Sequence, residues 1–529
     1  MADAAARLHA LTRHGSPVDR SQLVAFRALD PANRPAPFKR YPELPIVPLP
    51  TDPGTSGEAA AAVLSGRAHR DPATFDARLL ARLLFFSAGV TRVSHPAGGG
   101  QPTWFRAAMS AGNLHPVEVY VVCDRLGEVP AGVHHFAPLE VGLTMLREGD
   151  HRGGLAAATA APQLATASCS LVLTGIPFRT AWKYGERGYR HLFWDAGSML
   201  GNLLALAEAH GLPARVQVGF VDGAVAELVG VDGIEEVALA VVTIGRGDGR
   251  ALAEADVEHA ARPDPKSTPV APHPIHFPLI QEAHDDGALA DPDAVEAWRA
   301  ATVALGVPAA DEVDVPARAG DEPLEDVILR RGSTRLMRRD PVSHDLLSWG
   351  AGVAARPVPS DFSTAGRTLV QHFLAVHAVE GVEAGAYRWR DGLLEQGRPG
   401  EYREVTTQLC LDQPLGGDAA FTAFHAADLD GLVAELGSRA YRAAHLEAGV
   451  AAERLALAAF TLGYGATGLT FYDELVSQFF GTPAQCLLVT AVGVPAYRNR
   501  AGHGPGTPAE LAHFDQLMIR LEHRLRGGI

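Results

Sequence analysis

The chain has 529 residues, more than a single hydrophobic core normally holds, because cores stop growing near ~250–300 residues. Its 47% hydrophobic and 20% charged residues are typical of a globular protein, and its net charge of -15 argues against nucleic acid or an anionic membrane as a partner. No run of ~18 uncharged apolar residues predicts a membrane span, the first residues lack the apolar region of a secretory signal, and four widely spaced cysteines predict reduced, mostly buried thiols in a cytoplasmic protein.

In chain order, we expect an N-terminal extension (1–56), a first α+β domain (57–255), a Pro-rich linker (256–321), a second α+β domain (322–502) and a C-terminal tail helix (503–529). The division depends on an internal repeat. Residues 189–197 read YRHLFWDAG and residues 441–449 read YRAAHLEAG, so Tyr, Arg, an acid, Ala and Gly recur at the same spacing. Each motif leads into an apolar helical run that ends on a glycine and then into a β-like stretch (199–211 and 239–245; 454–463 and 486–493). The sequence predicts two copies of one α+β unit, an arrangement that often replaces a homodimer with an intramolecular pseudo-dimer.

The segment between the two copies is rich in proline, at positions 263, 265, 269, 272, 274 and 278. Such a composition favours an extended linker over a packed element. Residues 30–52 have a similar composition and are expected to wrap the surface.

Four short segments carry the candidate chemistry. In the first copy, residues 110–116 read SAGNLHP and precede an apolar strand, and residues 182–190 read WKYGERGYR. In the second copy, residues 330–335 read RRGSTR, and Arg498 and Arg500 follow a strand near the end of the unit.

Together these segments resemble the FMN-dependent nitroreductase superfamily, and within it the SagB-type azoline dehydrogenases that make thiazoles and oxazoles in ribosomal peptides. The resemblance covers both copies but neither the extension nor the linker. It implies two tandem nitroreductase-like α/β sandwich domains, an FMN cofactor and a peptide or carrier-bound heterocycle as substrate. A cyclodehydratase partner is implied by the resemblance alone.

Arg331, Ser333 and Arg335 place two guanidinium groups and a hydroxyl close together, and planar guanidinium groups suit phosphate. The resemblance assigns this segment to the FMN phosphate and the pyrimidine edge of the ring, with Arg498 and Arg500 completing the clamp. The alternative is a solvated basic patch at a helix start.

Ser110, Ala111, Gly112 and Asn113 are small residues that let backbone approach a flat ring, with an amide side chain to bond its polar edge. The alternative is an ordinary loop before a strand. In the second copy, the predicted turn of residues 467–471 is expected to lie along the ring, so that Gly468, Leu469 and Thr470 offer backbone N–H groups to it.

The two copies have not kept the same parts. The first copy lacks the RxSxR pattern near residues 64–72, and the second has TAGRTLV at 364–370 in place of SAGNLHP. In the family's dimers, one subunit grips the phosphate and the other supplies the loop that contacts the ring. We therefore expect one intact site, made from the second copy's grip and the first copy's loop, and one FMN per chain.

Lys183 and Tyr184 occur only in the first copy, and the resemblance makes them catalytic. Oxidation of an azoline requires loss of a proton to a base and of a hydride to flavin N5. A Lys cation beside Tyr184 is expected to lower the tyrosine pKa so that it can act as that base, and dioxygen can reoxidise the flavin. The alternative is a structural pair, with Lys183 in solvent and Tyr184 packed. Tyr189 and Arg190 recur in the second copy and are expected to be structural.

The leading functional hypothesis is an FMN-dependent azoline dehydrogenase. Two alternatives remain open: an NAD(P)H-dependent nitroreductase or quinone reductase on the same fold, and a scaffold protein without flavin. We find no metal-binding pattern; His134 and His135 are adjacent without ligand spacing and are expected in a loop or at the surface. The GGG run at 98–100 is a possible hinge for a lid.

Overall fold

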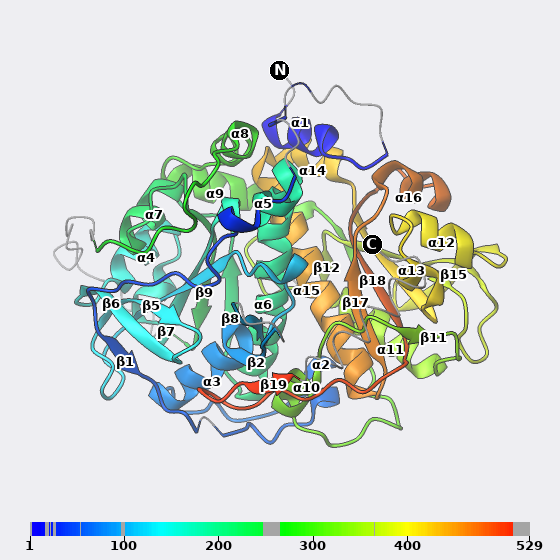
Figure 1. Cartoon of the computed structure of the whole chain (residues 1–529), viewed down its shortest axis with the longest axis horizontal. Helices are drawn as coiled ribbons and strands as arrows, with labels where there is room; N and C mark the ends of the chain where they lie inside the picture. Colours follow the sequence, from blue (N-terminus) through cyan, green and yellow to red (C-terminus); the bar gives the residue numbers. More distant parts are fainter. Residues whose placement is uncertain are drawn as a thin grey trace.

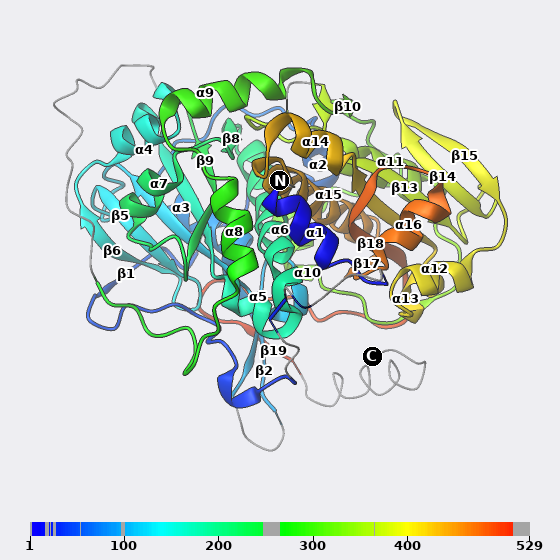
Figure 2. The same cartoon turned by 90° about the horizontal axis from the view of Figure 1, so that it is seen from above.

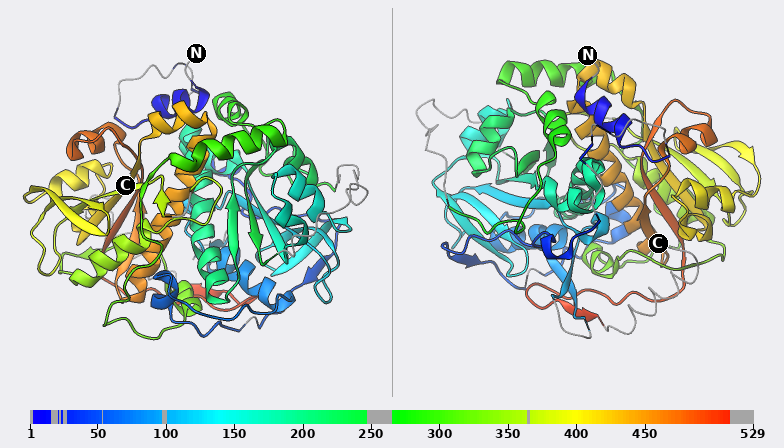
Figure 3. Two further views of the ribbon diagram at one scale, coloured as in Figure 1. Left: turned by 180° about the vertical axis from the view of Figure 1, so that it is seen from behind. Right: turned by 45° about the horizontal axis from the view of Figure 1, so that its top comes forward.

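A computed structural model of the chain describes residues 3–15, 21, 23–24, 28–52, 54–96, 101–246, 265–363 and 366–511. Figure 1 shows two β-sheets, one on each side of a central pair of long helices, and Figure 3 shows the same layers from behind. The GGG run and most of the predicted tail helix lie outside the described residues.

The two sheets repeat one strand order. The first half forms the order β1-β6-β5-β4-β7-β9-β8. The second half forms β15-β14-β13-β16-β18, with β17 and β11 both pairing with β18. Apart from the edge strands β1 and β11, each strand has a counterpart in the same place, which confirms the predicted tandem α+β architecture.

The strands of the first half are β1 (Ile46–Pro48), β2 (Val90–Ser94), β3 (Thr103–Arg106), β4 (Val117–Cys123), β5 (Gly132–Ala137), β6 (Gly142–Glu148), β7 (Cys169–Gly175), β8 (Ala214–Gln217) and β9 (Val237–Ile244). The later strands are β10 (Val307–Pro308), β11 (Met337–Arg338), β12 (Arg367–Thr368), β13 (Gln371–Val376), β14 (Gly385–Arg390), β15 (Leu393–Pro399), β16 (Phe421–Ala427), β17 (Gly465–Leu469), β18 (Gln485–Pro495) and β19 (Ala509–Leu511). Every pairing within the two large sheets is antiparallel.

The helices before the linker are α1 (Ala4–Leu11), α2 (Ala60–Leu64), α3 (Ala77–Ala88), α4 (Arg152–Ala158), α5 (Pro177–Tyr184), α6 (Gly188–Ala209) and α7 (Asp222–Val229). After it come α8 (Pro278–Asp286), α9 (Pro292–Ala301), α10 (Leu324–Arg330), α11 (His344–Ala355), α12 (Arg403–Leu409), α13 (Pro414–Asp418), α14 (Leu429–Leu436), α15 (Arg439–Thr461) and α16 (Asp473–Phe480). None of the helices in the described part of the chain is both long and apolar enough to cross a bilayer.

The repeated motif begins the two central helices, α6 and α15. Nearly every residue of both helices is buried, including charged side chains such as Arg190 and Glu447, because the two helices lie in the centre of the molecule. They cross at Gly197 and Gly449, the recurring glycines, where a Cβ on Gly197 would lie 2.8 Å from Cα of Gly449. A Cβ on Gly449 would in turn lie 2.5 Å from the carbonyl oxygen of Trp194. The glycines recur because only backbone without a side chain permits this approach.

Contacts between the halves are reciprocal. The N–H of Ala60 donates to the backbone carbonyl of Glu322, and the N–H of Leu324 donates to the backbone carbonyl of Glu58, so corresponding residues exchange hydrogen bonds across one point. The rings of Tyr189 and Tyr441 stack with centroids 5.8 Å apart. Such exchange is typical of an isologous interface.

The recurring arginines form matching ion pairs. Arg190 of α6 pairs with Asp473 at 3.0 Å, and Arg442 of α15 pairs with Asp222 at 2.6 Å. Arg190 and Arg442 lie in the first turns of the equivalent helices α6 and α15, and Asp222 and Asp473 are the first residues of α7 and α16. The prediction that Tyr189 and Arg190 are structural agrees with these buried contacts.

The linker departs from its predicted extended form. Residues 265–277 contain no helix or strand, but α8 and α9 follow, and Leu279, Ala283 and Trp298 are buried. Pro278 and Pro292 each occupy the first helical turn, where the missing N–H costs nothing, so proline begins these helices instead of preventing them. In Figure 2, α9 extends from the first half towards the second.

The vicinal histidines are also placed differently from the prediction. His134 and His135 lie in β5 and are buried, and Nε2 of His135 is 2.9 Å from a carboxylate oxygen of the buried Glu118. The sequence missed this because the apolar alternation of β5 is weak. All four cysteines are buried and unpaired, as predicted.

Candidate functional site

The loop before β4 contacts the Lys-Tyr pair. Gly112 has a φ of 63°, a left-handed conformation that favours glycine. A Cβ atom on Gly112 would lie 2.6 Å from Oη of Tyr184 and 3.3 Å from Nζ of Lys183. Because both side chains belong to the last turn of α5, two segments that the sequence singled out meet within the first half.

Asn113 braces this loop from within. Its Nδ2 donates to the carbonyl of Trp104 at 2.8 Å, and its Oδ1 lies 2.9 Å from Nε2 of His115. The N–H of His115 also donates to Oγ of Ser110 at 2.8 Å. The sequence assigned the Asn113 amide to the edge of the ring, but in the structure both ends of that amide are used to hold the loop.

Tyr184 is half-buried and stacks on His191 of α6, with ring centroids 4.3 Å apart. Burial raises the pKa of Tyr184 to about 12, and the nearby Asp195 carboxylate acts in the same direction, while Arg335 opposes both. The expectation that Lys183 lowers the pKa of Tyr184 is therefore wrong. Tyr184 is a neutral phenol near pH 7.

Lys183 shows the opposite shift. Its side chain is exposed, and Nζ lies 5.2 Å from the centroid of the Tyr184 ring. Partial desolvation lowers the pKa of Lys183, and the positive charges of Arg335 and Arg34 lower it further. Within the described residues, no carboxylate forms an ion pair with Lys183. Of the two groups, Lys183 is the better candidate for a base.

Arg335 belongs to the second half and acts on the Lys-Tyr pair of the first half. Its backbone N–H donates to Oη of Tyr497 at 2.9 Å, and its side chain is exposed. Desolvation lowers the pKa of Arg335, whereas Tyr497 and Tyr184 raise that pKa. The guanidinium thus lies within electrostatic range of both members of the Lys-Tyr pair.

Arg331, by contrast, is buried and already paired. It forms a 3.1 Å ion pair with Glu453 of α15 and donates to the carbonyl of Ala107, which precedes the SAGN loop. The RGSTR segment follows α10 instead of starting a helix. Its first arginine joins the two halves, and its second is the one open to a ligand.

Ser333 lies beside β17, with which it forms a parallel bridge at Ala466. The N–H of Thr334 donates to the carbonyl of Ala466 at 2.9 Å, so Ala466 turns its polar groups away from β18. Peptide orientation alternates along a strand, so Gly468 turns its N–H to the same side. The predicted turn of residues 467–471 is instead the end of β17, and that end includes Gly468 and Leu469. Thr470 follows directly.

The C-terminal arginines lie near the same segment. A Cβ on Gly332 would be 3.0 Å from the Asn499 side chain, which places residues 498–500 beside the RGSTR segment. Arg498 and Arg500 are both exposed. Arg500 also donates to the carbonyl of Glu510, which ties it to the following strand.

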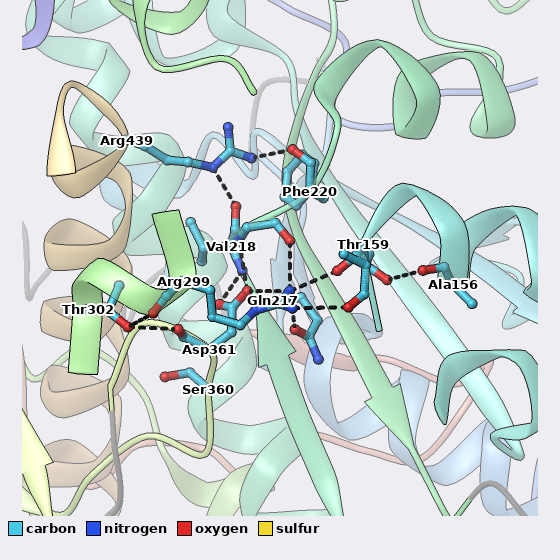
Figure 4. Close-up of polar contacts among 12 residues, drawn as sticks. Ala156, Thr159, Gln217, Val218, Phe220, Arg299, Thr302, Ser360, Asp361 and Arg439 are labelled. Carbon is cyan, nitrogen blue, oxygen red and sulfur yellow. Dashed lines mark hydrogen bonds and ion pairs between the residues drawn. The ribbon is translucent and has the colours of Figure 1, made fainter. Parts of the chain in front are cut away.

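The corresponding edge of β8 in the first half is filled by the chain itself (Figure 4). The N–H groups of Val218 and Gly219 donate to the Asp361 carboxylate at 2.8 and 2.9 Å. The N–H of Val216 donates to the carbonyl of Pro359 at 2.8 Å. A loop of the second half therefore pairs with this edge of β8, whereas among the described residues no loop donates or accepts a backbone hydrogen bond at Gly468 of β17.

Arg299 of α9 closes this filled edge. It lies 3.4 Å from Asp361 and donates to the carbonyl of Thr159 at 2.8 Å, as Figure 4 shows. Trp298 packs against Gly219 and donates to the carbonyl of Leu436 at 3.2 Å. The linker helix thus seals one of the two equivalent places.

A nitroreductase family model matches residues 81–246 and 328–494, more than half of the chain. The chain belongs to the nitroreductase family. Its two matched segments are the two repeated units described above.

Three relatives of this nitroreductase-family chain are informative. MJ1384 of Methanocaldococcus jannaschii, which bears the nitroreductase name, is 28% identical over 171 residues, 32% of this chain and 80% of its own. The microcin B17-processing protein McbC of Escherichia coli is 30% identical over 136 residues, 23% of this chain and 47% of its own. A crystal structure of a nitroreductase-like protein from Anabaena variabilis is 26% identical with a TM-score of 0.71, and covers 93% of this chain and 99% of its own.

The nitroreductase-family site contains residues that the sequence did not identify. Asp195 accepts a hydrogen bond from the N–H of Ala111 at 3.0 Å, and His191 stacks on Tyr184. Both lie in the repeated motif and could have been found by their helical spacing of four residues. No group of three or more metal-ligating side chains occurs among the residues that the structure places.

Proposed function

We propose that this nitroreductase-family protein is an FMN-dependent dehydrogenase that oxidises an azoline in a peptide or carrier-bound substrate to an azole. One observation carries the proposal: Gly112 contacts Lys183 and Tyr184 of the first half, and Arg335 of the second half lies within electrostatic range of that pair. The similarity to McbC, a protein named for microcin B17 processing, supports a peptide substrate. A cyclodehydratase that supplies the azoline is the partner that this reaction requires.

The residues present fit FMN. The open edge of β17 needs a polar partner, since the equivalent edge of β8 obtains one from Asp361. Gly468, Leu469 and Thr470 would hold the ring edge, and Ser110, Ala111 and Gly112 would approach its face. Ser333, Arg335, Arg498 and Arg500 would hold the phosphate and the pyrimidine side, while Arg331 would act indirectly by fixing Ala107. Among the described residues, the equivalent place beside β8 is filled by Asp361 and Arg299, so we propose one FMN per chain in an intramolecular pseudo-dimer.

Bound FMN would supply the hydride acceptor for this oxidation, with dioxygen as the final electron acceptor. The chain's own residues supply the base. Lys183 Nζ, with its lowered pKa, accepts the proton from the acidic ring carbon, and the neutral Tyr184 hydroxyl donates a hydrogen bond to orient the substrate.

An anaerobic mixing experiment tests this function. The FMN-loaded protein is mixed with a peptide that contains a preformed thiazoline, and the flavin's visible absorbance is followed. We expect bleaching together with the loss of two hydrogens from the peptide by mass. Absence of bleaching with the thiazoline, together with rapid bleaching by NADPH, would support a nitroreductase or quinone reductase instead.

A further inference from the structure

Asp195 of α6 lies directly behind the loop that meets the Lys-Tyr pair. The carboxylate is buried, and Oδ1 accepts a hydrogen bond from the N–H of Ala111 at 3.0 Å. Gly112, whose missing side chain leaves room for Tyr184, is the next residue. A single carboxylate on a rigid, buried helix therefore fixes the backbone at the point of contact.

The repeat provides an internal comparison. Glu447 occupies the same position of the second motif, and its carboxylate accepts from the N–H groups of Leu369 and Val370 at 2.6 and 2.9 Å. Those residues immediately precede β13, whereas Ala111 lies six residues before β4. Both acids anchor the entry to a strand, but only Asp195 anchors a long loop that reaches other candidate site residues.

A small cavity beneath the loop gives a second, independent observation. Its volume is about 10 Å³, and its lining includes Asp195, Ser110, Arg106 and His115. Oδ2 of Asp195 and Nε of Arg106 are buried without a hydrogen-bond partner in the described structure. A space of this size and polarity suits one ordered water molecule, which would link the carboxylate to Arg106 and stiffen the loop from behind.

We propose that Asp195 is a positioning residue that holds the Ser110–Ala111–Gly112 backbone against the cofactor, with one ordered water as part of the brace. It does not touch the substrate. The inference rests on the proposed FMN site, but the order of the loop itself can be measured without flavin.

The first test uses the FMN-free protein and hydrogen–deuterium exchange. Asp195→Ala removes the acceptor of the Ala111 N–H and is expected to raise exchange in the peptide spanning 108–116 about tenfold, because the net contribution of one buried hydrogen bond is about 1 kcal/mol or more, and about 1.4 kcal/mol is tenfold. Asp195→Asn keeps an acceptor oxygen and is expected to restore most of the protection. Glu447→Ala is the matched control and is expected to raise exchange only near residues 366–372.

The second test measures FMN affinity by quenching of flavin fluorescence. Asp195→Ala is expected to weaken FMN binding about tenfold, Asp195→Asn less, and Glu447→Ala not at all. Unchanged exchange at 108–116 in Asp195→Ala would overturn the inference, and so would equal losses of FMN affinity in Asp195→Ala and Glu447→Ala. Failure of the wild-type protein to bind FMN would instead overturn the proposed function and leave the exchange result to decide the role of Asp195.

Discussion

Lys183 and Tyr184 lie together at the loop, but the pKa of Tyr184 is raised instead of lowered as the sequence led us to expect, and the pKa of Lys183 is lowered. Burial and Asp195 keep Tyr184 protonated, whereas burial and two neighbouring arginines favour the neutral amine of Lys183. The sequence could predict that the two groups act together, because they are adjacent and occur once. It could not predict which one loses its proton, because that depends on how deeply each is buried and on Arg335 from the other half.

Replacement of Lys183 by Ala is expected to slow thiazoline-driven flavin reduction by about 100-fold or more, the usual contribution of a general base. Tyr184→Phe is expected to slow it less, because the phenol orients the substrate. Glu435→Ala is the control, since Glu435 is the exposed counterpart of Lys183 on α14. Stopped-flow absorbance measures all three rates. A lower rate of flavin reduction in Tyr184→Phe than in Lys183→Ala would indicate that Tyr184 is the base.

Gly112→Ala is expected to weaken FMN binding about tenfold while the fold remains, because the added methyl group would lie 2.6 Å from Tyr184 Oη and displace that side chain. Gly381→Ala separates this clash from backbone strain, since Gly381 also has a positive φ, of 73°, but nothing lies within 4 Å of its Cβ. Flavin content and far-ultraviolet circular dichroism of both variants are compared. Equal flavin content in the two variants would show that the contact at Gly112 is unimportant.

Glu447 makes a pH-dependent contribution to stability. Burial raises its pKa from 4.5 to about 7, so between those pH values the folded protein holds a proton that the unfolded chain releases. Stability from this group is therefore greatest at low pH and falls as the pH rises through this window, by up to about 3 kcal/mol. Glu447→Gln does not titrate, so its melting temperature relative to wild type is expected to be higher at pH 8 than at pH 5. A difference that is independent of pH would contradict the assignment.

At the scale of the elements, the packing of α6 against α15 joins the two halves. The sequence predicted the two helices from the repeated motif, and the structure explains why the motif contains glycine. Side-chain spacing alone could not show this, because the close approach of Gly197 to Gly449 involves helices that are distant in the sequence. The linker helices α8 and α9 were missed for a related reason: proline at a first helical turn resembles proline in an extended segment.

Gly197→Ala is expected to lower the free energy of unfolding by about 3 kcal/mol or more, because its methyl group would meet backbone atoms of α15 that cannot move independently. Gly223→Ala in α7 is the control: nothing lies within 4 Å of its Cβ, so alanine is expected to be neutral or slightly stabilising. Thermal unfolding of both variants tests this. A Gly197→Ala protein as stable as Gly223→Ala would mean that the two helices can separate without loss.

At the scale of the whole molecule, two equivalent places in the duplicated fold have diverged. Beside β8, Asp361 and Arg299 fill the edge, and beside β17 the RGSTR segment pairs with Ala466 and carries Arg335, which acts electrostatically on Lys183. The sequence indicated this asymmetry from the loss of the RxSxR and SAGNLHP patterns. It gave no sign of Asp361 or Arg299, because the chain segments that fill the edge carry no recognisable motif.

The number of flavins per chain tests this asymmetry most directly. The protein is saturated with FMN, freed of excess, and its acid-released flavin is compared with its chain concentration. One FMN per chain, bound more weakly by Gly112→Ala and unchanged in number by Asp361→Asn, is the predicted result. Two FMN per chain would show that the place beside β8 also binds flavin and would contradict the account.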